Sequence, residues 1–244
     1  MFGQGSRVVK STPRGDLTTV MVVLTLTTGV VEAVGFLVLG PVFTAMQTGN
    51  LLFLGFAVAG EGDLSAVASA VSLGAFAVGA ILGSRFESSE DTRGRGWFVR
   101  ALLTESALLC VAGLIAWEEV TGGPEPLSDR HYTVIALVAA AMGLRNVTTL
   151  RAGVPDLTTT VTTRTLTAFL GGSPFTPDTR IASGVRREGH RAAAIAAMFA
   201  GGLAGAWLLH EAVRPAVVLL LAAAAVLVTG LAYGLVPHAT SERT

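Results

Sequence analysis

Residues 17–39 read LTTVMVVLTLTTGVVEAVGFLVL. A helix needs about 20 mostly apolar residues to cross the hydrocarbon core of a bilayer, so this run is long enough to span a membrane. Glu32 lies inside the run. Because a carboxylate near the centre of a bilayer costs about 2.5 kcal/mol or more, we expect Glu32 to have a cationic partner, a proton or a polar cavity.

The composition predicts a polytopic membrane protein. Of the 244 residues, 51% are hydrophobic and 14% are charged, and the mean hydropathy is +0.63. Such a chain has little material for a soluble domain. The 17 basic and 17 acidic residues fall mostly between the apolar runs, so no nucleic-acid partner is expected. A single cysteine, Cys110, excludes an internal disulfide and a cysteine metal cage, and we expect no metal or cofactor.

Several apolar runs could enter the bilayer. They are residues 17–39, 42–60, 64–84, 97–117, 132–150, 154–171, 192–209 and 215–236. The run bounded by Trp97 and Trp117 is the clearest span, because a helix of this length places the two indoles about 30 Å apart. That distance puts one tryptophan in each interfacial belt.

Loop charge predicts how many runs cross. The 85–100 and 173–191 connections are rich in arginine, whereas the 118–130 connection is acidic. Basic loops stay in the cytoplasm, so the first two should be cytoplasmic and the third external. Eight full crossings from a cytoplasmic N-terminus would place 85–100 outside. We therefore favour six crossings, with 42–60 and 154–171 as re-entrant or broken elements.

Both shorter elements begin beside a proline, Pro41 or Pro155. Proline removes a backbone donor and breaks a helix, and in a membrane the freed backbone groups must be satisfied by protein or water. Whether the two elements cross fully or return to the side they entered stays open at this stage.

An internal repeat accounts for the position of these elements. A shift of 114 positions aligns Gly29 with Gly143, Glu32 with Asn146, Pro41 with Pro155, Thr44 with Thr158, Thr48 with Thr162 and Leu52 with Leu166. After a longer loop, Gly79 and Gly83 align with Gly201 and Gly205. Two matches in the same order favour duplication over chance similarity in a chain rich in Gly and Thr. Three crossings per half would turn the second half upside down, as in the inverted repeats of many secondary transporters.

The expected organisation is an all-α membrane helix bundle made of two inverted repeats. Its parts are a cytoplasmic tail (1–16), a first repeat (17–117), an external acidic loop (118–130), a second repeat (131–236) and a cytoplasmic tail (237–244). The glycine pairs of the repeat are small-xxx-small motifs that let helices approach closely. They could join helices within the chain or between copies, so a homo-oligomer through these faces is one open expectation.

Two stretches resemble the YoaK family of bacterial membrane proteins. They are GVVEAVGFLVLGPVFTAMQTGNLLFLG (29–55) and MGLRNVTTLRAGVPDLTTTVTTRTLT (142–167). The resemblance covers nearly the whole chain and implies a six-span integral membrane protein with no assigned biochemical function. The sequence differs from the family pattern at Arg145, where glutamine is usual, and at Thr163-Arg164, where uncharged small polar residues are usual.

Candidate binding residues lie in the two interrupted elements and beside them. Gln47, Thr48 and Asn50 carry amide and hydroxyl groups that could bind a small polar solute or, alternatively, satisfy the backbone freed at Pro41. The candidates in the second half are Asn146, which aligns with Glu32, Thr162, which aligns with Thr48, and Arg164, which aligns with Asn50. Threonines often bond back to their own helix. A guanidinium stays charged, so Arg164 needs a carboxylate or an anionic ligand unless its side chain reaches the cytoplasmic surface.

A second acidic residue, Glu105, lies near the middle of the 97–117 span. Arg145 or Arg164 could pair with Glu105 or with Glu32. A structural ion pair and a site that couples to a proton or cation both fit this pattern. The sequence leaves the choice between them open.

An enzyme is not expected. The histidines His131, His190, His210 and His238 lie at or beyond the ends of the spans, and the HExxH, GxSxG and Walker spacings are missing. The remaining classes are a transporter-like carrier of a small polar or anionic solute, with or without proton coupling, and a non-transporting scaffold that binds partners. In either case we expect a multi-pass protein of the cytoplasmic membrane, in contact with lipid, with both termini in the cytoplasm.

Overall fold

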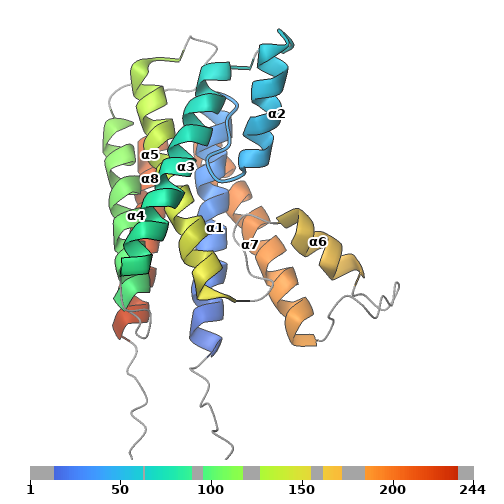
Figure 1. The fold of residues 1–244 in the computed structure, drawn as a ribbon, viewed down its shortest axis with the longest axis vertical. Coiled ribbons are helices and arrows are strands. Elements are labelled where there is room, and N and C mark those ends of the chain that lie inside the picture. Colours follow the sequence, from blue (N-terminus) through green and yellow to red (C-terminus); the bar gives the residue numbers. More distant parts are fainter. Residues whose placement is uncertain are drawn as a thin grey trace, which may run out of the picture.

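The computed structural model describes residues 14–62, 64–89, 96–117, 127–154, 162–171 and 185–235, and the regular elements in these ranges are all helices. The helices are α1 (Arg14–Leu37), α2 (Gln47–Val58), α3 (Ala66–Ser89), α4 (Gly96–Ile115), α5 (Asp129–Ala152), α6 (Thr162–Gly171), α7 (Val185–His210) and α8 (Pro215–Leu235) (Figure 1).

Six of these helices are long and apolar enough to cross a membrane: α1, α3, α4, α5, α7 and α8. The other two, α2 and α6, have 12 and 10 residues. At a rise of 1.5 Å per residue, neither reaches across the roughly 30 Å hydrocarbon core. The predicted all-α bundle with six spans and two shorter elements is therefore confirmed.

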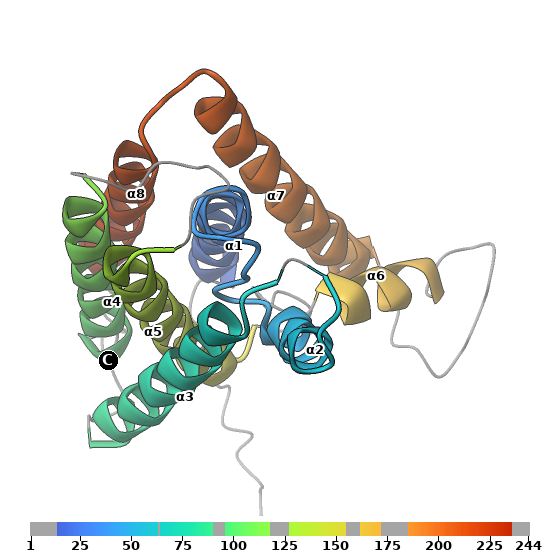
Figure 2. The ribbon, with the colours of Figure 1, turned by 90° about the horizontal axis from the view of Figure 1, so that it is seen from above.

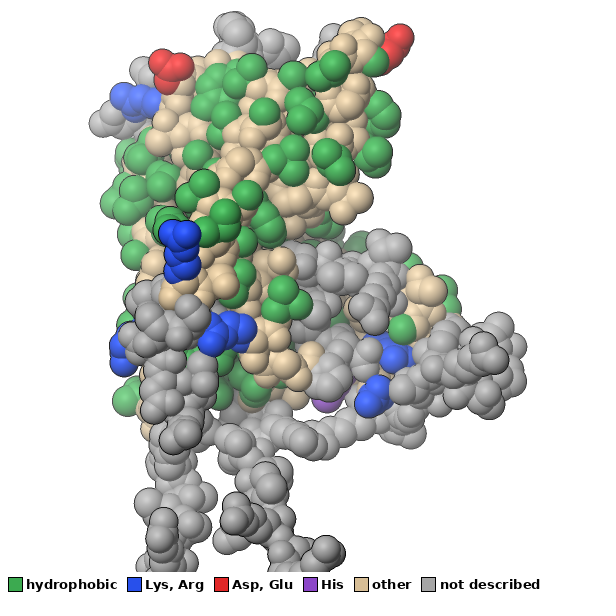
Figure 3. Space-filling model, viewed as in Figure 1, with side chains coloured by type: hydrophobic (Ala, Val, Ile, Leu, Met, Phe, Trp, Pro, Cys, Tyr) green, Lys and Arg blue, Asp and Glu red, His purple; other side chains and the backbone are tan. Residues whose placement is uncertain are grey.

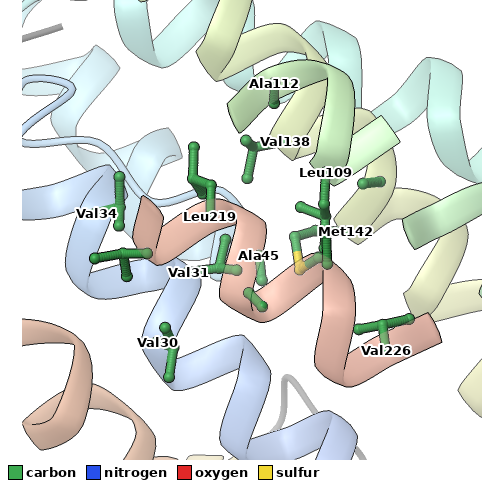
Figure 4. Close-up of a cluster of buried hydrophobic side chains, with 14 of the residues drawn as sticks. Val30, Val31, Val34, Ala45, Leu109, Ala112, Val138, Met142, Leu219 and Val226 are labelled. Carbon is green, nitrogen blue, oxygen red and sulfur yellow. The ribbon is translucent and has the colours of Figure 1, made fainter. Parts of the chain in front are cut away.

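The first span forms the centre of the bundle. Seen from above, α1 is surrounded by the other long helices (Figure 2). Helices α2 and α6 lie on the same side of the bundle but at different levels, α2 packed on α3 near the upper end and α6 packed on α7 in the lower half (Figure 1). In the apolar part of α1, 72% of the residues are buried, the largest share among the six spans. Valines of α1 pack with Leu109, Val138 and Leu219 from α4, α5 and α8 (Figure 4). Thr25, Thr28 and Glu32 of α1 are consequently enclosed by protein rather than exposed to lipid.

Each half of the chain contains a break after its first span. Helix α1 ends at Leu37, and α2 begins at Gln47, five residues later than the apolar run begins. The link includes Gly40, which has a φ of 89° and so takes a backbone conformation that L side chains rarely adopt. In the second half, α5 ends at Ala152 and α6 begins at Thr162. Pro155 and its neighbours up to residue 161 lie outside the described residues.

The glycines of the repeat lie at close contacts between helices of different halves. A Cβ added at Gly201 of α7 would overlap the carbonyl oxygen of Leu26 in α1. A Cβ at Gly79 of α3 would overlap the carbonyl oxygen of Ala140 in α5, the residue that the shift of 114 aligns with Leu26. Thus α1 packs on α7 and α5 packs on α3, through aligned glycines.

Aligned helices also run in opposite directions. In Figure 1, α1 and α4 ascend whereas their counterparts α5 and α8 descend, and α3 descends whereas α7 ascends. Because the small-xxx-small glycines already contact helices of the same chain, these faces are occupied within the monomer. A homo-oligomer would need another face.

Candidate functional site

Glu32 holds the linking segment between α1 and α2, residues 38–46, against α1. Its Oε1 accepts hydrogen bonds from the Thr44 amide at 3.0 Å and the Thr44 hydroxyl at 2.9 Å, and from the Ala45 amide. Gly35, one turn further along α1, lets the carbonyl of Val42 approach closely. The carboxylate therefore satisfies amide groups that the helix break leaves without helical partners.

The second carboxylate oxygen of Glu32 differs from the first. Glu32 is 5% exposed, and its Oε2 has no hydrogen-bond partner among the described residues. Buried polar atoms in native proteins nearly always have a partner, so an exception calls for a structural or functional explanation.

The opposite side of the same segment is held by Asn50 of α2. Its Oδ1 accepts the Phe43 amide at 2.8 Å, and its Nδ2 donates to the Phe43 carbonyl. Nδ2 also donates to Gln47 at 2.7 Å and to Ser72 of α3 at 3.0 Å. Asn50 and Ser72 are fully buried. The amide of Asn50 thus replaces the backbone partners that Phe43 lacks outside a helix.

Gln47 completes this network, which we call the polar cluster: Glu32, Thr44, Gln47, Asn50 and Ser72. The Gln47 amide nitrogen donates to the Thr44 carbonyl at 2.8 Å and to Ser72 at 3.2 Å. The structure therefore brings three of the predicted site residues to one segment, and it adds Thr44 and Ser72. Ser72 was detectable as a small polar residue inside an apolar span, but its partners were not.

Thr48 lies on a different face of α2 from Asn50 and is exposed. It takes no part in the hydrogen bonds of the polar cluster. A site that includes Thr48 would therefore need a ligand, or a neighbouring surface, on this other face of α2.

The second buried acid forms an ion pair. Glu105 of α4 accepts hydrogen bonds from Arg145 of α5, with Nε to Oε1 at 2.8 Å and a second contact from Nη2. Nη1 of Arg145 donates to the Leu24 carbonyl at 2.9 Å and to the Thr28 hydroxyl at 2.8 Å, both on α1. Both charged side chains are 1% exposed. Arg145 thus links three helices and is already engaged by protein.

The second-half candidates are less fully described. Asn146 is half-buried on α5, next to Arg145. Thr162 and Arg164 lie in the first turn of α6, and their side chains are outside the described residues. The single cavity that was predicted to join these residues with Glu32 remains a prediction.

The two ends of the bundle differ in charge. The acidic side chains visible in Figure 3 lie at the upper end, and most of the visible basic side chains lie in the lower half. Each end also has a tryptophan beside an arginine. The Arg151 guanidinium lies 5.6 Å from the Trp97 ring, and that of Arg214 lies 5.6 Å from the Trp117 ring. Amphipathic indoles at both ends of α4 are typical of the two membrane interfaces.

These features define a multi-pass helical membrane protein with charged groups buried between its spans. Residues 20–232 match the family described as "Protein of unknown function (DUF1275)", and the chain belongs to this family. It is similar to the UPF0700 transmembrane protein YoaK of Bacillus subtilis (strain 168), with 29% identity over 153 residues, which confirms the resemblance seen in the sequence.

That alignment covers 62% of this chain and 65% of the relative, so it spans slightly less than two thirds of the curated protein. No solved structure matches the chain. Neither the family description nor the name of the relative states an activity, so function must be argued from the site.

Proposed function

We propose that the protein is a carrier-like membrane protein that binds a small polar solute between two inverted halves. The observation that carries the proposal is the broken segment after α1, which is held beside a buried carboxylate with one open oxygen. Secondary transporters use interrupted helices of this kind, at matching positions of two inverted repeats, to bind solutes near the midplane.

Reciprocal packing supports the inverted repeat. Gly201 meets Leu26 as Gly79 meets Ala140, and aligned helices run in opposite directions (Figure 1). An exchange of helices between halves makes each half depend on the other. A rocking motion of one half against the other would then alter the surroundings of both breaks together.

In this proposal the solute lies between the first and second breaks. Glu32 of the polar cluster contributes one side, and Asn146, Thr162 and Arg164 contribute the other. Arg145 positions α1 against α4 and α5 through Glu105 and Thr28 and does not contact the solute. We propose no catalytic role for any of these groups.

A non-transporting scaffold is the second candidate, and one observation favours it. Asn50 and Gln47 direct their amides to the protein's own backbone, which a purely structural role would explain. In that case Glu32 would serve only to hold the linking segment.

A ligand screen separates the two candidates. We would measure thermal unfolding of the purified protein in detergent across a panel of small polar metabolites, and then uptake of each stabilising solute into proteoliposomes. A carrier should show saturable stabilisation by at least one solute and uptake of the same solute. If Glu32 also couples a proton, Glu32→Gln should remove the pH dependence of uptake. Absence of stabilisation by every solute would favour the scaffold.

Orientation in the membrane can be tested with single cysteines. We propose that both termini are cytoplasmic, because the basic residues gather at the end of the bundle where α1 begins (Figure 3). In a Cys110→Ala background, Glu61→Cys should react with an impermeant thiol reagent in intact cells, whereas Ser89→Cys should be protected until the cells are permeabilised. The reverse pattern would invert the topology, and reaction at both positions would contradict six crossings.

A further inference from the structure

We infer that the open oxygen of Glu32 binds a small, singly charged cationic group, either an alkali ion or the ammonium group of a solute. The inference deepens the proposed function and rests on it, because it names the charge class that the site accepts. It follows from the hydrogen bonds of one carboxylate and from the position of the neighbouring arginine.

The two carboxylate oxygens of Glu32 differ in their hydrogen bonds. Oε1 has three donors from the linking segment, and Oε2 has none among the described residues. The donors to Oε1 are two backbone amides and one hydroxyl, and none of them carries a formal charge. An ionised carboxylate in an interior of low polarity needs a counter-charge as well as hydrogen bonds.

The described part of the chain provides no such counter-charge for Glu32. Arg145 contacts α1 one turn away, at Thr28, but its guanidinium pairs with Glu105. Of the pairings that the sequence left open for Arg145, the structure shows the one with Glu105. What remains at the linking segment is a negative group, which attracts cations and repels the anionic end of a solute.

Thr44 supplies a second oxygen for the cation. Its hydroxyl donates its only hydrogen to Glu32 and therefore keeps lone pairs on Oγ1, which is fully buried beside the carboxylate. Oxygen ligands suit hard cations. A divalent metal is disfavoured, because no group of three His, Cys, Asp or Glu side chains gathers among the described residues.

The experiment compares chloride salts of sodium, potassium, methylammonium and choline at equal ionic strength. It is done at pH 8, where few protons compete with the cation for the Glu32 carboxylate. Thermal unfolding of the full-length protein is followed in detergent for the wild type, Glu32→Gln and Glu61→Gln. Glu61 is an exposed glutamate outside the spans and provides the matched control for the same chemical change.

We expect at least one small cation to raise the Tm of the wild type and of Glu61→Gln by several degrees, in a saturable manner, relative to choline. Glu32→Gln should lose this response. A response to sodium or potassium would assign the site to a coupling ion, and a response to methylammonium alone would assign it to the amine of a solute. An equal response in all salts, or one that persists in Glu32→Gln, would overturn the inference.

If Glu32→Gln fails to fold, Glu32→Asp tests whether the cation binds at Glu32. Its carboxylate is retained but set back by one methylene, so the midpoint concentration of the cation should rise at least several-fold. An unchanged midpoint would count against binding at Glu32. If a cation stabilises the protein through Glu32 but no solute is taken up, the proposed carrier function is refuted and the cation site is supported. The reverse result, uptake with no cation response in the wild type, would refute only the cation site.

Discussion

Glu105 and Glu32 are both buried in the same helix bundle, yet their surroundings differ. Glu105 has a guanidinium that bonds to it twice and ties α4 to α5 and α1. Glu32 has two amides and a hydroxyl on one oxygen and no partner among the described residues on the other. The charge of Glu105 is therefore paired within the protein. Glu32 is held by hydrogen bonds to one oxygen only and has no counter-charge among the described residues, so its second oxygen can still accept a ligand.

Removal of one partner of the Glu105–Arg145 ion pair should destabilise the protein most. Glu105→Gln leaves the Arg145 charge without its counter-ion in the interior, and breaking a buried ion pair costs about 3–5 kcal/mol. Equilibrium unfolding in detergent and urea measures this loss. The double variant Glu105→Leu with Arg145→Met removes both charges and should recover much of the stability. A loss below about 1 kcal/mol in the single variant would mean that water or lipid headgroups reach Arg145.

The next largest losses of stability are expected at the helix contacts that position both glutamates. Gly79→Ala and Gly201→Ala each push a methyl group into the carbonyl oxygen of a facing helix, and overpacking of this kind costs about 1–3 kcal/mol or more. Gly74→Ala and Gly202→Ala, on the same two helices, meet open space and should be neutral or stabilising. Thermal unfolding of the four variants tests the exchange of helices between halves. Similar values for all four would contradict it.

The linking segment itself can be loosened from the α2 side. Asn50→Leu leaves the Phe43 amide without its side-chain partner and leaves the Phe43 carbonyl with the Ser72 hydroxyl alone, at a cost of about 1–3 kcal/mol. Thr48→Val lies on the same helix but is exposed, so its effect should stay within about 0.5 kcal/mol. Chemical denaturation compares the two. Equal losses would show that Asn50 does not hold the segment against α2.

Removal of the Glu32 charge should change stability least of all. Glu32→Gln keeps an acceptor oxygen for Thr44 and Ala45 and removes the charge, so we expect a change below about 1 kcal/mol. The same substitution at position 105 should cost several times more. A large loss at position 32 would instead indicate that the carboxylate is neutralised by a cationic group of the protein outside the described residues.

Part of this architecture could be read from local features of the chain. The six spans and two shorter elements follow from run length and loop charge, because insertion into a bilayer depends on the hydropathy of each segment. The importance of Glu32, Asn50 and Glu105 follows from the cost of polar groups at membrane depth. The alignment of Gly79 with Gly201 also singled out the residues at the closest helix contacts.

Other features were decided only by the tertiary structure. Glu105 and Arg145 are separated by 40 positions, and nothing in local spacing chooses Arg145 for Glu105 rather than for Glu32. Likewise, small-xxx-small motifs favour close packing without specifying whether the partner helix belongs to the same half, the other half or another copy. The pairing depends on how α1, α4 and α5 meet in three dimensions. That arrangement pairs Arg145 with Glu105 and leaves Oε2 of Glu32 without a partner among the described residues.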